Sequence, residues 1–148
     1  MVKSAIVVCE NCGTKNRIPL DRIDHKPLCG SCKTPLIREQ IHTAPVVGTD
    51  QNFDREVLTP RQGVLVNFWA PWCGHCKAMA PVMEGLAKAY AGRVKVVTIN
   101  VDENASTSSR FRVMSLPSLL FFKAGKVVDS TVGALSRAEI ETRLKPLF

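Results

Sequence analysis

The sequence lacks long hydrophobic runs. Before Cys9 the longest apolar run is Ala5–Val8, far shorter than the hydrophobic region of a secretory signal peptide. No uninterrupted apolar stretch later in the chain approaches the roughly 20 residues that a membrane-spanning helix needs. We therefore expect a soluble, cytoplasmic protein that has no membrane partner.

A cluster of basic residues is also missing, although the net charge is +7. Residues 1–45 carry seven Lys or Arg against four Asp or Glu, and residues 46–148 carry thirteen against nine. The first 45 residues contain no Phe, Trp or Tyr on which a base could stack. This pattern disfavours a nucleic-acid partner. It is typical of a solvated surface with a weak attraction for acidic proteins.

Cysteine, in contrast, is present in a strict pattern, because all six cysteines form three CxxC pairs. In a reducing cytosol such pairs are metal ligands or redox catalysts more often than static bridges. The first two pairs, Cys9/Cys12 and Cys29/Cys32, have the spacing of a four-cysteine zinc site, and Gly13 and Gly30 would allow their tight turns. Four thiolates favour one structural zinc ion without an open position. Two disulfides are the alternative.

These two pairs, which we call the knuckles, lie in a small unit at residues 1–40. A unit of this size cannot bury enough apolar surface to fold unaided, so zinc should hold it together. Residues 41–45 are expected to be a linker, and residues 46–148 a second domain. The knuckle unit could dock a partner, shield or extend a substrate groove, sense oxidants by releasing zinc, or only stabilise the chain.

The second domain alternates between strand and helix patterns. Val64–Trp69 and Val94–Val101 are typical of strands buried on both faces, and an apolar stripe predicts a helix from Cys76 to Tyr90. The order predicts an α/β fold with a mixed sheet covered by helices on both faces. Weaker signals predict a short helix at residues 105–111, a hairpin around Ala124-Gly125, and a helix capped by Ser136 with Glu139.

The third pair, Cys73 and Cys76, lies between the first strand and this helix. The unpaired N–H groups and the positive end of the helix dipole favour a thiolate there, so Cys73, with an exposed sulfur, should attack substrate disulfides. Cys76, one turn further, should be shielded and should resolve the mixed disulfide. The pair could instead be half of a zinc site with ligands such as His42 or His75, but its βαβ setting favours redox chemistry.

The stretch WAPWCGHCK, with Pro81, LPS at Leu116–Ser118 and VGALS at Val132–Ser136, resembles the thioredoxin family. With the two knuckles, the chain resembles the zinc-containing thioredoxin 2 type of bacteria, in a CGHC variant. The resemblance implies a thioredoxin fold preceded by a small zinc ribbon. It also implies an oxidoreductase that reduces disulfides in client proteins through a redox-active Cys73–Cys76 disulfide. Thioredoxin reductase would supply electrons from NADPH, and no organic cofactor would be bound.

The resemblance also implies a substrate groove beside Cys73. Pro117 would be a cis-proline packed opposite Cys73, which shapes the groove and keeps metal away from the thiols. A flat, apolar groove fits unfolded or extended segments around a disulfide. Its residues would be Trp72, Leu116, Pro117, Val132, Gly133 and Ala134.

The sequence departs from the thioredoxin pattern at His75, Asn67 and Thr98. His75 replaces the usual Pro and gives the CGHC pair typical of protein disulfide isomerase. Its imidazole can favour the Cys73 thiolate, which would place the potential between about −270 and −180 mV. It could also be an incidental exposed residue. We group His75, Gly74, Asn67 and Lys77 as residues expected to tune the redox pair.

Asn67 and Thr98 stand where thioredoxins have a buried Asp and a nearby Lys. A neutral amide cannot act as a general base for the Cys76 proton, although Asn67 could equally be a structural core amide. Two rivals to a reductase remain. One is a more oxidising, isomerase-like catalyst, and the other is a zinc-ribbon binding protein or redox-regulated holdase.

Overall fold

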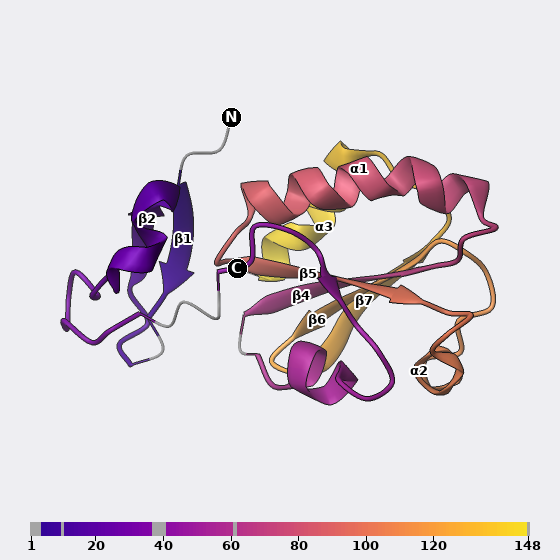
Figure 1. Cartoon of the computed structure of the whole chain (residues 1–148), viewed down its shortest axis with the longest axis horizontal. Coiled ribbons are helices and arrows are strands. Elements are labelled where there is room, and N and C mark those ends of the chain that lie inside the picture. Colours follow the sequence, from indigo (N-terminus) through magenta and orange to yellow (C-terminus); the bar gives the residue numbers. More distant parts are fainter. Residues whose placement is uncertain (1–3, 10, 37–40, 61, 148) are drawn as a thin grey trace.

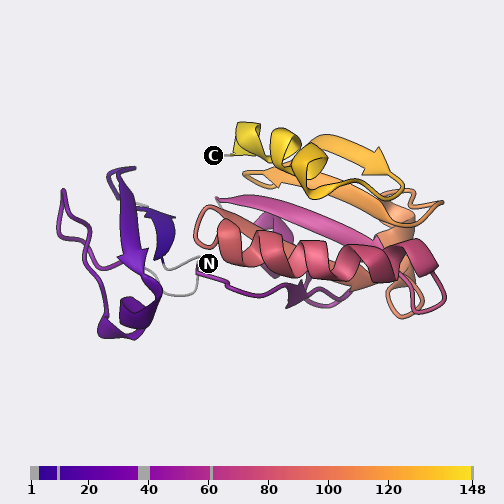
Figure 2. The ribbon, with the colours of Figure 1, turned by 90° about the horizontal axis from the view of Figure 1, so that it is seen from above.

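The computed structural model describes residues 4–9, 11–36, 41–60 and 62–147 (Figure 1). The last residues of the expected N-terminal unit, 37–40, therefore lie outside the described residues. No helix in the described ranges is both long enough and apolar enough to cross a membrane. A small N-terminal unit, the ribbon, lies at one end of the long axis, and the larger domain fills the rest (Figures 1 and 2).

The ribbon is built on an antiparallel pair of strands, β1 (Ser4–Val8) and β2 (Lys15–Pro19), followed by a 3₁₀ helix, η1 (Leu20–His25). Its buried residues are only Ala5, Val7, Cys9, Ile18, Cys29 and Leu36 among those that the structure describes. So small a core contributes little, which agrees with the expectation that the unit needs a metal or a crosslink.

The larger domain contains a five-stranded sheet in the order β3-β5-β4-β6-β7. Strands β3, β5 and β4 are parallel to one another, β6 pairs antiparallel with β4, and β6 and β7 form an antiparallel hairpin. The predicted mixed sheet is therefore confirmed. The strands are β3 (Val46–Val47), β4 (Gly63–Trp69), β5 (Val94–Asn100), β6 (Ser118–Lys123) and β7 (Lys126–Val132).

Helices cover both faces of the sheet because successive side chains of its central strands point to opposite sides. Leu65 of β4 packs with α1 (Gly74–Ala89) and α3 (Arg137–Leu144) above the sheet in Figure 1. Its neighbours Val64 and Val66 pack on the other face with η3 (Asp54–Leu58), a single π-helical turn, and with Phe111, which follows α2 (Ala105–Arg110). The predicted α1 stripe is buried at Met79, Met83, Leu86 and Ala87.

The structure confirms the turn and the helix cap that we predicted in the second half of the domain. Ala124 and Gly125 have φ values of 51° and 79°, as the tight β6–β7 turn requires. Ser136 caps α3, accepting a hydrogen bond from the Glu139 N–H at 3.2 Å. In contrast, we predicted neither η3 nor the ribbon strands.

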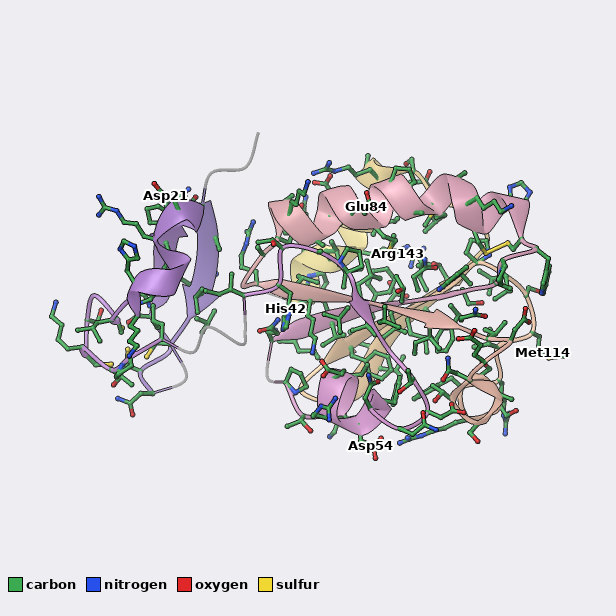
Figure 3. All side chains as sticks on the ribbon, in the orientation of Figure 1. Asp21, His42, Asp54, Glu84, Met114 and Arg143 are labelled. Atoms are coloured by element: carbon green, nitrogen blue, oxygen red, sulfur yellow. A yellow bond between two sulfur atoms is a disulfide. The ribbon has the colours of Figure 1, made fainter. Side chains whose placement is uncertain are left out.

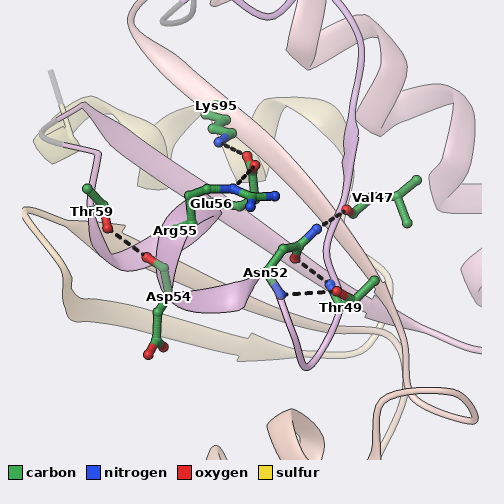
Figure 4. Close-up of polar contacts among 8 residues, drawn as sticks. All are labelled: Val47, Thr49, Asn52, Asp54, Arg55, Glu56, Thr59 and Lys95. Carbon is green, nitrogen blue, oxygen red and sulfur yellow. Dashed lines mark hydrogen bonds and ion pairs between the residues drawn. The ribbon is translucent and has the colours of Figure 1, made fainter.

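An ion pair attaches η3 to the sheet (Figure 4). The ammonium group of Lys95, on β5, is buried and donates to the Glu56 carboxylate, which Arg55 also contacts at 3.2 Å. The Lys95 hydrogen bond is the main reason that the pKa of Glu56 lies below its ordinary value. Just before η3, Thr49 and Asn52 exchange hydrogen bonds that fix the entering turn.

The ribbon contacts the larger domain just beyond the C-terminal end of α1. The Ile6 N–H of β1 donates to the Ala91 carbonyl at 3.2 Å. Gly92 has a φ of 86°, and a Cβ there would collide with the Ile6 carbonyl oxygen. Since α1 has 16 residues, this contact lies about 24 Å along the helix from its N-terminus.

Candidate active site and metal centre

Cys73 is the N-cap residue of α1 and is disulfide-bonded to Cys76. The backbone N–H of Cys76 donates to the Cys73 sulfur at 3.2 Å. The same N–H would stabilise a thiolate in the reduced protein, together with the positive end of the helix dipole. The disulfide lies at the end of the molecule opposite the ribbon (Figure 3). The ribbon therefore neither shields nor extends this site in the structure.

The exposure of Cys73 differs from our expectation. Cys73 is only 7% exposed and Cys76 only 3%, because Ala70, Trp69 and Leu116 pack around both sulfurs in a small cluster. Exposure alone therefore does not distinguish an attacking from a resolving cysteine in the oxidised form. The position of Cys73 at the N-terminus of α1 is what favours it as the attacking cysteine.

The expected groove residues come together beside the disulfide. The Leu116–Pro117 peptide bond is cis, as the resemblance implies, and Leu116 packs against the cysteine cluster. The Gly133 N–H donates to the Pro117 carbonyl at 2.8 Å, and Val132 is paired with the first residue of β6. Ala134 is exposed and follows directly. The loop before β6 and the end of β7 thus form one wall.

Trp72 is 70% exposed, and its indole N–H donates to both carboxylate oxygens of Asp102 at 3.2 and 3.1 Å. Our sequence analysis missed Asp102. A signal existed: Asp102 follows β5, and the carboxyl ends of the parallel strands β4 and β5 meet at one edge of the sheet. We also missed Met114, which is 92% exposed and lies at the disulfide end of the domain (Figure 3).

The residues expected to tune the pair divide into two groups. Gly74, His75 and Lys77 are exposed in the first turn of α1. Asn67 is 3% exposed on β4, paired in register with Thr98 of β5. Its side-chain oxygen has no hydrogen-bond partner among the described residues. The tuning roles of all four stay predictions.

A cavity of about 560 Å³ lies behind the disulfide. Cys76 and further residues of α1 line it, together with Asn67 of β4 and Thr98 of β5. Residues 43–45, which lead from the ribbon into β3, form a further wall. Cys76 thus lies between the groove residue Leu116 and this cavity.

The four knuckle cysteines form the second site. Their sulfur atoms all lie within 4.8 Å of one another. Two pairs join opposite knuckles, with 3.7 Å between the sulfurs of Cys9 and Cys32 and 3.5 Å between those of Cys12 and Cys29. Tetrahedral zinc with bonds of about 2.3 Å separates its sulfur ligands by about 3.8 Å. The cluster therefore fits a tetrahedral metal ion.

The two knuckles have the same turn. In each, the N–H of the fifth residue donates to the carbonyl of the first cysteine, Gly13 to Cys9 at 2.8 Å and Lys33 to Cys29 at 3.0 Å. Both donors have left-handed backbones, with φ values of 78° and 64°. Gly30 lies inside the second turn as expected, but Lys33 occupies the left-handed position equivalent to Gly13.

Polar side chains beside the cluster favour the thiolates of Cys29 and Cys32. The Thr34 hydroxyl, 3.2 Å from the Cys32 sulfur, and the Asn11 amide, 3.6 Å away, lower the pKa of Cys32 to about 5. The Asn16 amide lies 3.6 Å from the Cys29 sulfur. Groups of this kind orient metal ligands and keep them deprotonated.

The sequence comparisons agree with both sites. Residues 44–146 match the family described as thioredoxin, and residues 8–34 match the one described as the N-terminal part of thioredoxin 2. The chain belongs to the thioredoxin family. Its catalytic pair and fold therefore identify a thiol-disulfide oxidoreductase, preceded by a zinc-ribbon unit.

Individual relatives cover the larger domain. The chain is 44% identical over 97 residues to thioredoxin 1 of Nostoc sp. The aligned region covers 66% of this chain and 91% of the relative. It is 46% identical over 96 residues to thioredoxin 1 of Synechococcus elongatus, covering 65% and 90%. It is also 46% identical over 96 residues to thioredoxin 2 of Chlorobaculum tepidum, covering 65% and 88%.

Proposed function

We propose that the chain reduces disulfides in client proteins. The Cys73 thiolate attacks one sulfur of the client disulfide, which forms a mixed disulfide and releases the other client sulfur as a thiolate. Cys76 then attacks the Cys73 sulfur, which releases the second client thiol and leaves Cys73–Cys76 oxidised. Two electrons pass to the client in each cycle.

The observation that carries this proposal is the hydrogen bond from the Cys76 N–H to the Cys73 sulfur at the N-terminus of α1. It stabilises Cys73 both as the attacking thiolate and as a leaving group. The neighbouring wall at Leu116, cis-Pro117 and Val132 supports an extended, apolar client segment as the substrate. Trp72 would form the opposite side.

The proposed electron source is a thioredoxin reductase that uses NADPH, in keeping with the family. The proposed compartment is the cytoplasm, because the knuckle thiolates and the catalytic dithiol persist best under reducing conditions. Clients and the reductase would use the same end of the domain, since the disulfide is reached there.

For the ribbon we propose one structural zinc ion held by Cys9, Cys12, Cys29 and Cys32. When bound, it would crosslink the two knuckles and would have no open position for catalysis. We propose functional boundaries of 1–40 for the ribbon, 41–45 for the linker and 46–148 for the catalytic domain.

The test is reduction of insulin disulfides by the wild type, Cys73→Ser and Cys76→Ser. We expect turnover only in the wild type, and a stable mixed disulfide with client at Cys73 in Cys76→Ser. Turnover that survives in Cys73→Ser would contradict the proposal. If the wild type failed to reduce insulin while Cys73→Ser still suppressed client aggregation, the chain would instead be a binding protein or holdase.

A second candidate, an oxidising isomerase-like catalyst, is favoured by His75 between the two cysteines. Equilibration with glutathione redox buffers measures the redox potential, which distinguishes a net reductant from a net oxidant. A potential below about −200 mV supports the reductase, and a higher one supports the isomerase. His75→Pro should lower the potential if the imidazole stabilises the Cys73 thiolate.

A further inference from the structure

Exposed apolar side chains gather at the disulfide end of the catalytic domain. Among the described residues, the four most exposed large hydrophobic side chains are Met114, Val47, Trp72 and Val132. Trp72 and Val132 belong to the proposed client groove, and Met114 lies at the same end of the domain (Figure 3). Single exposed apolar residues are common on soluble proteins, but several at one place mark a docking surface. Met114 therefore extends the apolar surface around the groove.

The backbone on both sides of Met114 is held in place. Leu116, two residues further, packs against the cluster of the catalytic cysteines, and two residues of chain span at most about 7 Å. On the other side, the Val113 N–H donates to the Ser108 carbonyl at 2.9 Å, and the Val113 side chain packs against one of the two cores of the sheet. Met114 is thus fixed beside the groove, while its own side chain is 92% exposed.

The thioether of Met114 can be modified in a way that the other groove residues cannot. Methionine is flexible and polarizable, so it adapts to apolar partners of different shape. Oxidation to the sulfoxide makes the same side chain polar and chiral. Met79 and Met83, on α1, are only 2% and 1% exposed. A dissolved oxidant therefore reaches Met114 before either of these two methionines.

We propose that Met114 is a peroxide-sensitive contact for clients: the methionine helps to dock them, and the sulfoxide weakens docking. A hydroperoxide transfers one oxygen atom to the Met114 sulfur. The O–O bond breaks, an S–O bond forms, two electrons pass from sulfur to the peroxide, and the peroxide leaves as water or an alcohol with its proton. The Cys73–Cys76 pair takes no part. This inference rests on the proposed function and adds regulation to the same groove.

The expected effect is on docking because a client that covers Met114 must remove water from the polar S–O group. Such desolvation is unfavourable unless the client supplies a hydrogen-bond donor. A small disulfide can reach the catalytic sulfurs without covering Met114. Oxidation should therefore raise the KM for a protein client and leave the reaction with a small disulfide unchanged.

The site of modification is tested by treating the oxidised full-length protein with hydrogen peroxide, so that the catalytic pair is protected as its disulfide. Peptide mass spectrometry follows the gain of one oxygen atom at each methionine. Met114 should be oxidised at least about tenfold faster than Met79 and Met83, because exposure governs the reaction. Equal rates at the three methionines would overturn the inference.

The consequence is tested with insulin and with a small aromatic disulfide as substrates. In the treated wild type, the KM for insulin should rise about two- to fivefold, a loss typical of a single interface side chain. The matched control is Met114→Leu, which stays apolar but has no sulfur. The same treatment should leave its KM at the value measured before treatment. Met114→Gln, which is polar and similar in length, should raise the KM without peroxide.

Two results would contradict the role of Met114. One is an unchanged KM for insulin after full conversion of Met114 to the sulfoxide, or an equal rise in Met114→Leu. The other is an equal loss of activity with the small disulfide, which would locate the effect at the cysteines. Insulin reduction by the untreated wild type tests the proposed function, so the two proposals are judged separately.

Discussion

The two kinds of CxxC pair in this chain have the same spacing and different chemistry. Cys73 and Cys76 bond to each other at the start of α1, whereas the knuckle sulfurs approach one another from opposite knuckles, Cys9 with Cys32 and Cys12 with Cys29. The backbone after the first cysteine makes the difference. At Cys73 it continues into a helix whose N–H groups stabilise one thiolate, and at Cys9 and Cys29 it turns back, so that the sulfurs of both knuckles converge. Spacing alone therefore does not decide the use of a CxxC pair.

The two regions also differ in what stabilises them. The catalytic domain has two cores, one on each face of its sheet. The ribbon has a small cluster that includes two of its own metal-binding candidates. We therefore expect the ribbon to depend on metal and the catalytic domain to be independent of it.

The largest effect should come from Cys29→Ser. Losing one of four sulfur ligands should release the metal, whose binding contributes about 10–16 kcal/mol to such units, and the ribbon should unfold. Metal analysis and NMR dispersion of the ribbon signals would measure this, while the catalytic domain keeps its fold. Ser31→Ala in the same knuckle is the control and should retain metal. A ribbon that stays folded without metal would refute the dependence.

Glu56→Gln should destabilise the catalytic domain by about 3 kcal/mol, because it leaves the buried Lys95 without its partner. The effect should depend on pH. The folded-state pKa of Glu56 is depressed, so the stabilisation is complete above the unfolded value of about 4.3 and is lost as pH falls through the folded value.

Urea unfolding between pH 3 and pH 7 would measure this dependence. The wild type and Glu56→Gln should converge at the acidic end. Arg55→Gln, at an exposed neighbour, should change stability little at either pH. A constant gap between wild type and Glu56→Gln would rule out the linkage.

Gly92→Ala tests the contact between the two regions. The added Cβ meets the Ile6 carbonyl at a left-handed position, which should cost about 1–3 kcal/mol or separate the ribbon from the domain. Small-angle scattering would detect an elongated particle. Gly85→Ala, inside α1 and facing only the flexible end of Arg137, should instead stabilise by about 0.5–1 kcal/mol.

Asp102→Ala should have the smallest effect. Loss of the acceptor for the Trp72 indole removes hydrogen bonding worth about 0.5–1.5 kcal/mol, so the KM for insulin should rise by about two- to tenfold. The rate with a small aromatic disulfide should change little. Glu103→Ala, at the next exposed position, is the control. Equal changes in both variants would show that only surface charge matters.

Strong local patterns allowed much of the fold to be predicted. The continuous apolar run of β4, the stripe of α1, the Ala124-Gly125 turn and the Ser136 cap are all formed by neighbouring residues. By contrast, η3 is short and mostly polar, and the Lys95–Glu56 pair that holds it joins residues 39 positions apart. No local pattern could reveal it.

The candidate functional site likewise combines features that the sequence predicted with features that it did not. The six cysteines and the groove residues followed from spacing and family resemblance. The low exposure of Cys73, the role of Asp102 as an acceptor and the cavity behind Cys76 arise where β4, β5, α1 and residues 43–45 meet. These features depend on packing between distant segments, which a single sequence does not display.

The most direct test of the account is the pH dependence of iodoacetamide alkylation in the reduced protein, with the two catalytic cysteines distinguished by peptide mass spectrometry. We predict that Cys73 is labelled rapidly, with a midpoint clearly below the value of about 8.5 for a free cysteine, and that Cys76 is labelled slowly. Equal, slow labelling of both with an ordinary midpoint would show that α1 does not hold Cys73 as a thiolate.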